Sequence, residues 1–324
     1  MLVLTRAEVE RLYTMADAFA AVERAAVAWT TGQADVPTRS ALHAGESGLE
    51  ALVMPGVVGG KYAGTKIWYA GSGSPRLPAS SALIVLVDPG LGEVVMDGSV
   101  ITDLRTGAMT GVAARVLAPR RASVAAIIGA GIQARAQAHA LVHALPGLRE
   151  LRITSRRAQS RTACADELRS ELAEKSPQLV ISTTDDAEAA CRGSDVIVAA
   201  TTSRHPVVFD EWVGAETLVC GVGSHSPDAA EIDPAIVRRA GVVAVDTRRG
   251  AIDGAGDIAP VIAEGGLERD RVLELGDLVA TPPTGIAGPR VLKTVGFAAA
   301  DLVSAHSVAV AAVESGIGRR LAIH

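Results

Sequence analysis

Residues 123–144 read SVAAIIGAGIQARAQAHALVHA, and this stretch decides the fold. A compact apolar run precedes a glycine-rich turn and a segment of helical length follows it, which predicts a strand, a turn and a helix. Gly129, Gly131 and Ala134 form the pattern G-x-G-x-x-A. The first glycine allows the tight turn, the second lets the backbone approach a pyrophosphate, and the small third residue lets helix and strand pack closely. Because the helix N-terminus then faces the anion, we expect a dinucleotide site at this turn.

Several more strand and helix patterns follow this motif. Segments of helical length separate apolar runs that read LRELRIT, QLVIST, DVIVAAT, ETLVCGVG and GVVAVD. Such alternation is typical of a parallel sheet covered by helices. We therefore predict an α/β fold, with a Rossmann dinucleotide-binding domain over residues 119–295. A flavin is the alternative dinucleotide, but flavin proteins usually carry the motif near the N-terminus, so its late position favours a nicotinamide.

The residues after the second predicted strand indicate which nicotinamide cofactor is bound. An acidic side chain at the end of LRELRIT would accept hydrogen bonds from the ribose of NAD. Ser155, Arg156 and Arg157 stand there instead. A hydroxyl and two guanidinium groups suit a 2′-phosphate, which favours NADP(H) and leaves NAD(H) possible. The alternative is that both arginines are solvated residues at a helix start.

Two helices are expected near the N-terminus. Each is predicted by a hydroxyl three residues before a carboxylate, the pattern in which a helix start is capped by reciprocal hydrogen bonds; the pairs are Thr5 with Glu8 and Thr14 with Asp17. The second helix should stop at Gly32, where a left-handed backbone costs little.

The sequence pattern changes after these helices. Residues 36–98 contain short apolar runs separated by glycine and proline, which predicts antiparallel strands and turns. Residues 295–316 predict one long helix that packs back on the first domain. We therefore expect a discontinuous α+β domain made of residues 1–118 with 296–324.

Composition excludes several classes of function. The formal net charge of −5 gives no general field for nucleic acid or an anionic membrane. Apolar runs stay shorter than the roughly 18 residues that span a bilayer, so we expect a cytoplasmic protein without nucleic-acid or membrane partners. The cysteines Cys164, Cys191 and Cys220 lie far apart without CxxC spacing or a histidine cluster. Neither a disulfide framework nor a metal site is expected.

Three cations stand out in the first domain because few others lie near its predicted strands. They are Arg39, Lys66 and Arg105, with Lys61 and Arg76 as rivals. If the three converge, they can hold a substrate carboxylate, and the arginines supply paired hydrogen bonds that fix its orientation. Each of them alone is more often a solvated surface charge.

Together, these segments resemble the ornithine cyclodeaminase and mu-crystallin family over nearly the whole chain. The matching pieces are Arg39, EALVMP around Glu50, TKIW around Lys66, ITDLRTGAMTG, IIGAGIQARAQ, DVIVAATTS, GVGSHSPDAAEID and RVLKTVGFAAADL. The resemblance implies a homodimer in which the discontinuous domain binds substrate and forms the subunit contact. The Rossmann domain would carry the cofactor.

The resemblance also assigns roles to single residues. Arg39, Lys66 and Arg105 fall on positions that hold an amino acid carboxylate, and Glu50 falls on a proton-transfer position. Positions near the pyrophosphate correspond to Gln133 and Ala134, and cofactor-lining positions correspond to Thr201, Val222, Gly223 and Thr294.

One departure from the family pattern bears on the reaction. Cyclodeaminases carry G-x-D-x-P-G-K, whereas this chain has His225 in the aspartate position and Asp228-Ala229 in place of the Gly-Lys pair. A histidine is a poorer partner than a carboxylate for the distal ammonium of a diamine. The segment is more similar to the branch with mu-crystallin and bacterial cyclic-imine reductases. Alternatively, His225 is a pocket-wall residue hydrogen-bonded to backbone.

The leading hypothesis is NAD(P)H-dependent reduction of a C=N bond next to a carboxylate. The expected substrate is a small imino acid such as 1-pyrroline-2-carboxylate, 1-piperideine-2-carboxylate or a related ketimine. Lys66, Glu50, His225 or water would supply the proton that makes the carbon electrophilic. The alternatives are ornithine or lysine cyclodeamination, an alanine dehydrogenase-type reaction, and a non-catalytic binding protein like a crystallin.

Overall fold

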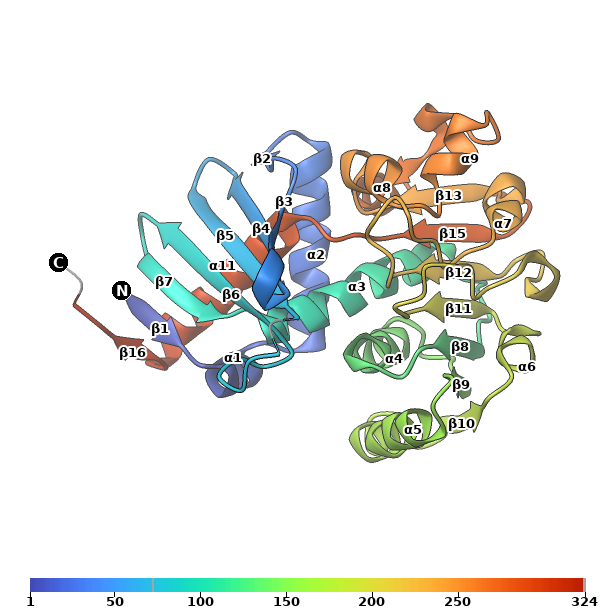
Figure 1. Ribbon diagram of the computed structural model, residues 1–324, viewed down its shortest axis with the longest axis horizontal. Coiled ribbons are helices and arrows are strands. Elements are labelled where there is room, and N and C mark those ends of the chain that lie inside the picture. The colour runs from blue at the N-terminus through green and yellow to red at the C-terminus, as the bar shows by residue number, and fades with distance from the viewer. Residues whose placement is uncertain (72, 323–324) are drawn as a thin grey trace. The chain divides into compact units, whose positions relative to one another are not determined.

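The computed structural model describes residues 1–71 and 73–322 and divides the chain into two compact units (Figure 1). The first unit comprises Met1–Arg105 and Phe297–His324, and the second comprises Thr106–Gly296. The division falls inside helix α3 (Ser99–Leu117), earlier than the domain boundary expected after residue 118. One unbroken helix belongs to both units, and the sequence carries turn signals only at its end.

The first unit contains a mixed sheet that is mostly antiparallel, as its short apolar runs predict. In spatial order its strands are β16 (Arg319–Arg320), β1 (Leu2–Leu4), β7 (Gly92–Asp97), β6 (Ser80–Asp88), β5 (Tyr62–Ala70), β4 (Leu49–Val58) and β2 (Ala34–Asp35), and β3 (Ser40–Ala44) also pairs with β4. Strand β1 is parallel to β7, and the long strands β4 to β7 pair in antiparallel register.

The helices of the first unit begin and end close to the predicted positions. They are α1 (Arg6–Leu12), α2 (Met15–Thr30) and α11 (Ala298–Ser315), and η1 (Gly45–Ser47) is a short 3-10 turn. Both predicted capping boxes are confirmed at the starts of α1 and α2. Helix α11 ends at Gly316, which takes the left-handed conformation with φ 66°.

Helix α11 packs against α2 and across one face of strands β4 to β6. A side chain at Gly64 on β5 would place its Cβ 2.7 Å from Leu302 on the helix and 2.4 Å from the carbonyl oxygen of Val85. Glycine therefore lets the helix approach the sheet. Because side chains alternate along a strand, Lys66 lies on the same covered face, two residues further on.

The second unit is a parallel sheet with helices on both faces, which is the predicted Rossmann class (Figure 1). Its strands in spatial order are β10 (Val180–Thr184), β9 (Glu150–Thr154), β8 (Val124–Ile128), β11 (Val196–Ala199), β12 (Leu218–Gly221), β15 (Arg290–Lys293), β13 (Val242–Val245) and β14 (Leu273–Glu274). Its helices are α4 (Ile132–Ala144), α5 (Ala158–Leu172), α6 (Ala187–Cys191), α7 (Pro234–Arg239), α8 (Arg248–Gly254), α9 (Ala259–Ala263) and α10 (Leu275–Ala280), with 3-10 turns η2 (Asp210–Trp212) and η3 (Arg269–Arg271).

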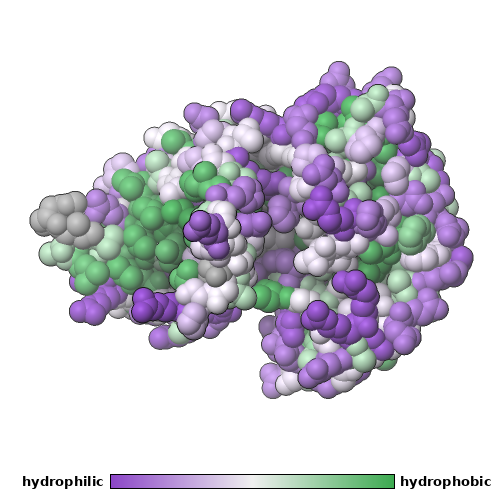
Figure 2. Space-filling model, viewed as in Figure 1, coloured by the Kyte–Doolittle hydropathy of each residue, from purple (hydrophilic) through white to green (hydrophobic). Residues whose placement is uncertain are grey.

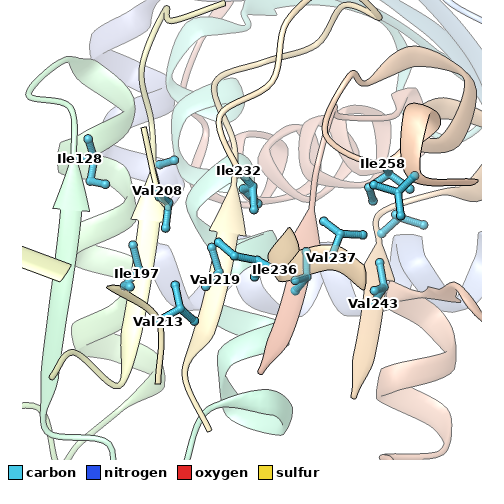
Figure 3. Close-up of a cluster of buried hydrophobic side chains, with 14 of the residues drawn as sticks. Ile128, Ile197, Val208, Val213, Val219, Ile232, Ile236, Val237, Val243 and Ile258 are labelled. Atoms are coloured by element: carbon cyan, nitrogen blue, oxygen red, sulfur yellow. The ribbon is translucent and has the colours of Figure 1, made fainter. Parts of the chain in front are cut away.

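Branched aliphatic side chains form the core under one face of this sheet (Figure 3). Ile197 on β11, Val219 on β12 and Val243 on β13 each contribute to it and are almost fully buried. The apolar runs read from the sequence are therefore strands of this sheet, including the edge strand β10, and their carboxyl ends present the loops described below. Within the described part of the chain, we find no helix with the length and apolar character needed to cross a membrane.

Candidate functional site

The glycine-rich turn connects β8 to α4 in the second unit. Gly129 has φ 121°, and a Cβ there would lie 2.2 Å from the carbonyl oxygen of Ala200, so a side chain is excluded at this position. Gly131 is the N-cap of α4, and the space where its Cβ would stand is open within 4 Å. Ala134 is buried between helix and strand. Each residue thus has the local geometry that its predicted role requires.

A cavity of about 650 Å³ opens at the carboxyl ends of β8, β9 and β11. Residues 128–131, 155–157 and 200–205 line it, together with Ser160 and Val207. The order of the strands reverses direction between β8 and β11, and open α/β sheets bind ligands at this kind of switch point. The volume, the open space at Gly131 and the helix start fit the phosphate part of a dinucleotide.

The wall of this cavity that follows β9 is basic and polar. Ser155, Arg156 and Arg157 line the cavity as predicted, and both arginine side chains are exposed. Arg204 and His205 line it as well, and sequence reasoning missed them. Among the described residues that line the cavity, none is acidic. An anionic ligand group therefore meets donors and cations here.

Five predicted cofactor residues lie outside this lining: Gln133, Ala134, Val222, Gly223 and Thr294. Val222 donates its backbone N–H to the carbonyl of Ala199, at 2.9 Å, and Thr294 donates its own to Gly221, at 3.1 Å. These two residues hold neighbouring strand ends together. Their assignment to the cofactor stays a prediction.

Glu231 is a buried acid that joins the loops after β11 and β12. Its Oε1 accepts hydrogen bonds from the backbone N–H of Thr201 and from Thr201 Oγ1, both at 2.7 Å. Its Oε2 accepts from the backbone N–H groups of Gly223, at 2.5 Å, and Ser224, at 3.0 Å. Burial raises the pKa of Glu231, while the charge of Lys293 and these donors lower it. The carboxylate therefore fixes Thr201, which lines the cavity, against the Gly223 loop.

A second buried acid supports this arrangement. Lys293 Nζ lies 2.9 Å from Asp257 Oδ2 and donates to Ser224 Oγ at 2.8 Å. Asp257 Oδ1 accepts the backbone N–H of Glu231 at 2.6 Å. Sequence reasoning predicted Thr201 and Gly223 in these loops. It missed the buried groups that hold them, which are Glu231, Asp257 and Lys293. Two signals were available in the sequence. Lys293 ends the short segment RVLK, and Glu231 stands in AAEID.

The first unit brings predicted cations together around an acid that sequence reasoning also missed. Asp301 on α11 accepts hydrogen bonds on Oδ1 from Lys66 Nζ, at 2.8 Å, and from Arg105 Nε, at 2.9 Å. Lys66 and Asp301 are 1% and 0% exposed, and Arg105 is 5% exposed. Arg39 is half-buried and lies close enough for its charge to act on Lys66. Two of the three predicted cations, Lys66 and Arg105, thus meet at one carboxylate, and the charge of Arg39 reaches Lys66.

The environment of Lys66 makes its charge labile. Burial, together with the charges of Arg105 and Arg39, lowers the pKa of this ammonium to about 8, while Asp301 acts in the opposite direction. Lys66 is therefore protonated at neutral pH and titrates only slightly above it.

The other predicted catalytic residues lie in exposed positions. Glu50 is on β4, with its side chain 60% exposed and its carboxylate 3.7 Å from Nδ1 of His43. His225 is exposed, and its Nδ1 is 3.2 Å from the carbonyl oxygen of Gly223. The backbone contact is the one expected in the alternative interpretation of His225. The proposed proton-transfer roles of Glu50 and His225 stay predictions.

A parallel sheet with a glycine-rich turn before α4 and a cavity at its carboxyl edge defines a Rossmann-type dinucleotide-binding protein. The chain belongs to the ornithine cyclodeaminase/mu-crystallin family, whose model matches residues 1–316.

Three similar proteins illustrate the range of this family. The ketimine reductase mu-crystallin of Mus musculus is 31% identical over 244 residues, which cover 74% of this chain and 72% of that protein. The Delta(1)-pyrroline-2-carboxylate reductase of Thermococcus litoralis, solved with NADH and L-proline, has a TM-score of 0.90 and 30% identity and covers 99% of this chain and 100% of its own. An archaeal alanine dehydrogenase dimer with bound NAD has a TM-score of 0.88 and 30% identity, covering 100% of this chain and 99% of its own.

Replacing Glu231 by glutamine should weaken dinucleotide binding. The amide would turn an NH2 group toward backbone donors that now meet a carboxylate oxygen, which costs about 1–3 kcal/mol when buried. We expect the Kd for NADH or NADPH, measured by fluorescence titration, to rise about tenfold. Glu174→Gln, on an exposed side chain of the same unit, is the control and should leave the Kd unchanged. Equal Kd values for the two variants would contradict the role given to Glu231.

Proposed function

We propose that this protein uses NAD(P)H to reduce a C=N bond adjacent to a carboxylate and so forms an amino acid. The substrate class is a small imino acid, such as 1-pyrroline-2-carboxylate, 1-piperideine-2-carboxylate or a related ketimine. The observation that carries the proposal is the buried cation pair of Lys66 and Arg105 on Asp301, in a chain that also has a dinucleotide cavity. Relatives named ketimine reductase and pyrroline-2-carboxylate reductase support it.

The cation cluster suits a carboxylate. Lys66, Arg105 and the half-buried Arg39 carry three positive charges, of which Asp301 neutralises one. Charge-assisted hydrogen bonds from an ammonium and a guanidinium are among the strongest polar contacts in proteins. An incoming carboxylate therefore lowers the remaining charge of the cluster from two to one, and its orientation fixes that of the attached C=N group.

The same cluster supplies a proton source. Reduction adds a hydride to the carbon and a proton to the nitrogen of the C=N bond, and bound NAD(P)H supplies the hydride. Lys66 holds a proton at neutral pH and, with a pKa of about 8, releases it more easily than an ordinary lysine. We assign the proton to Lys66 Nζ; Glu50 and His225 are the other proposed donors.

Two other reactions of the family are distinguished from imine reduction by their substrates and products. A cyclodeaminase would release ammonia from ornithine or lysine without net consumption of NADPH. An alanine dehydrogenase-type enzyme would oxidise NADPH or NADH with pyruvate plus ammonia. The exposed His225, in place of a carboxylate, disfavours the first because it lacks a fixed negative charge for the distal ammonium.

Changing Lys66 to methionine should abolish efficient reduction. Loss of a charged partner for the carboxylate costs about 2–5 kcal/mol, so kcat/KM for cyclic imino acids should fall at least about 30-fold in a spectrophotometric NADPH assay. Lys61→Met, at an exposed lysine in the turn before β5, is the matched control and should keep full activity. In the wild type, kcat/KM should decline as the pH rises through about 8, because Lys66 then loses its charge.

The imino acid assay also includes pyruvate plus ammonia, ornithine and lysine as alternative substrates. Preference for one of these, or full activity of Lys66→Met, would overturn the proposed reaction.

The basic wall of the cavity supports a preference for NADP(H) over NAD(H). Arg156 and Arg157 follow β9, where an NAD enzyme places an acid that accepts from the ribose. A 2′-phosphate brings negative charge and acceptor oxygens to these side chains, and Ser155 adds a hydroxyl. Relatives with bound NADH or NAD support the nicotinamide, and the basic residues are the support for its phosphorylated form.

The double variant Arg156→Ala/Arg157→Ala should separate the two cofactors. Each lost charge-assisted hydrogen bond costs about 1.5–3 kcal/mol, so the Kd for NADPH should rise at least about tenfold while the Kd for NADH stays within about twofold. Arg120→Ala/Arg121→Ala removes two consecutive exposed arginines before β8 and serves as the control. An equal loss of NADH and NADPH affinity would argue against 2′-phosphate recognition.

One face of the first unit's sheet supports a homodimer. It carries apolar side chains on the side turned away from α11, and Figure 2 shows hydrophobic residues gathered over this sheet. Four of them are 37% to 51% exposed: Val57, Ile67, Leu83 and Val87. A contiguous apolar area of this kind is typical of a surface that another chain covers. We assign it to a second copy of this chain, and the alanine dehydrogenase dimer supports that choice.

Placing charges on this face should prevent dimer formation. Ile67 and Leu83 are cross-strand partners on β5 and β6, so Ile67→Lys/Leu83→Lys puts two cations at one point. Light scattering after size-exclusion chromatography should give half the wild-type mass. Val180→Lys, on exposed β10 of the second unit, should leave the mass unchanged. A wild-type monomer, or an unchanged mass for the double variant, would exclude this interface.

A cytoplasmic location also belongs to the proposal. Cys164, Cys191 and Cys220 are all free and buried, as thiols in a reducing compartment usually are.

A further inference from the structure

We propose that Asp301 is the positioning residue of the carboxylate clamp, acting through both Lys66 and Arg105. The proposal rests on the proposed function, because the clamp is part of it. Asp301 belongs to helix α11, Lys66 to strand β5 and Arg105 to helix α3. One carboxylate therefore ties side chains from three separate elements of the first unit to a single point.

The hydrogen bonds define the orientation of both cations. Lys66 Nζ and Arg105 Nε donate to the same oxygen, Oδ1, at 2.8 and 2.9 Å. Fixing Nε fixes the plane of the guanidinium, and with it the direction of the two Nη groups that pair with carboxylates. Fixing Nζ leaves the ammonium two further N–H directions. Asp301 Oδ1 is therefore the shared acceptor that keeps the Lys66 ammonium and the Arg105 guanidinium next to each other.

Asp301 also makes the cluster electrostatically possible. Lys66 and Arg105 are buried neighbours of like charge, and two such charges repel strongly away from water. Asp301 reduces their net charge from two to one, which leaves the pair attractive to one substrate carboxylate. Asp301 raises the pKa of Lys66, while burial, Arg105 and Arg39 lower it, and Asp103 on α3 is a further acid whose charge interacts with Lys66 and Arg105.

A purely structural role does not account for the way Asp301 is bonded. Both contacts use Oδ1, whereas Oδ2 is buried and has no hydrogen-bond partner among the described residues. An unsatisfied buried carboxylate oxygen lowers stability, and an alanine would suit the small-residue run FAAADL around it. Asp301 is fully buried, so it acts through Lys66 and Arg105 and does not itself touch the substrate.

Asp301→Asn tests the charge while keeping an acceptor oxygen. We expect KM for the imino acid to rise at least about tenfold, with a smaller change in kcat, and the alkaline limb of kcat/KM to move about one pH unit below its wild-type position near pH 8. The Kd for NADPH should stay unchanged. An unaltered alkaline limb together with an unaltered KM would overturn the proposal.

Ser304→Ala is the matched control on the same helix. Ser304 is buried and accepts a 2.6 Å hydrogen bond from Tyr13 Oη, so its loss should lower the melting temperature. It should leave KM and the alkaline limb in place. If Ser304→Ala shifted the pH profile as Asp301→Asn does, the effect would belong to the packing of α11 and the proposal would fail.

A second variant covers the case in which Asp301→Asn does not fold. Lys66→Met/Asp301→Asn removes one cation and the carboxylate together, so the net charge of Lys66, Arg105 and Asp301 stays at one. Compared with Lys66→Met alone, it should raise KM a further several-fold, because Arg105 is no longer oriented. Identical KM values for the single and double variants would contradict the role of Asp301.

Failure of the proposed function is distinguished by a measurement that needs no activity. The side-chain nitrogen resonance of Lys66, assigned by its loss in Lys66→Met, can be titrated in the wild type and in a folded Asp301 variant. A lower titration midpoint without the carboxylate supports the proposal even if the wild type reduces no imino acid. Equal midpoints overturn it.

Discussion

A lysine ammonium buried in the first unit is the constraint on which the candidate active site depends. A buried charge is unfavourable unless it is paired, and Lys66 is paired with Asp301 while Arg105 shares the same oxygen. The arrangement requires α11 to lie directly on β5, and Gly64 makes this approach possible. Packing, charge and the proposed chemistry of this unit are therefore parts of one arrangement.

The second unit also contains buried, paired carboxylates, and there they fix loops. Glu231 and Asp257 are buried acids whose partners are backbone N–H groups, a threonine and a lysine, and they fix loops at the carboxyl edge of the sheet. In both units a buried carboxylate orients the groups assigned to the candidate site, Lys66 and Arg105 in the first and Thr201 in the second. Exposed acids such as Glu50 lack this rigidity, because solvent screens them and their side chains are free to rotate.

Local signals made much of this structure predictable. The turn at Gly129 and the capping box at Thr14 depend on residues a few positions apart, and both are confirmed. The strand β15 was missed, because RVLK is short and pairs with β12 and β13 only through a long crossover. Asp301 and Glu231 were missed because their partners also lie far away in the sequence. Asp301 meets Lys66 across 235 positions of sequence, and in the sequence each acid looks like any other polar residue of a helix or loop.

The late position of β15 and α11 in the chain has a consequence for biosynthesis. Strand β15 lies between β12 and β13 in the second sheet, and α11 covers the sheet of the first unit. Residues 290–315 thus supply an interior piece to each unit. On the ribosome, most of both units emerges before residues 290–315 do, so until then the second sheet lacks β15 and the first sheet lacks its covering helix. Folding of the two units consequently depends on the synthesis of the same short segment.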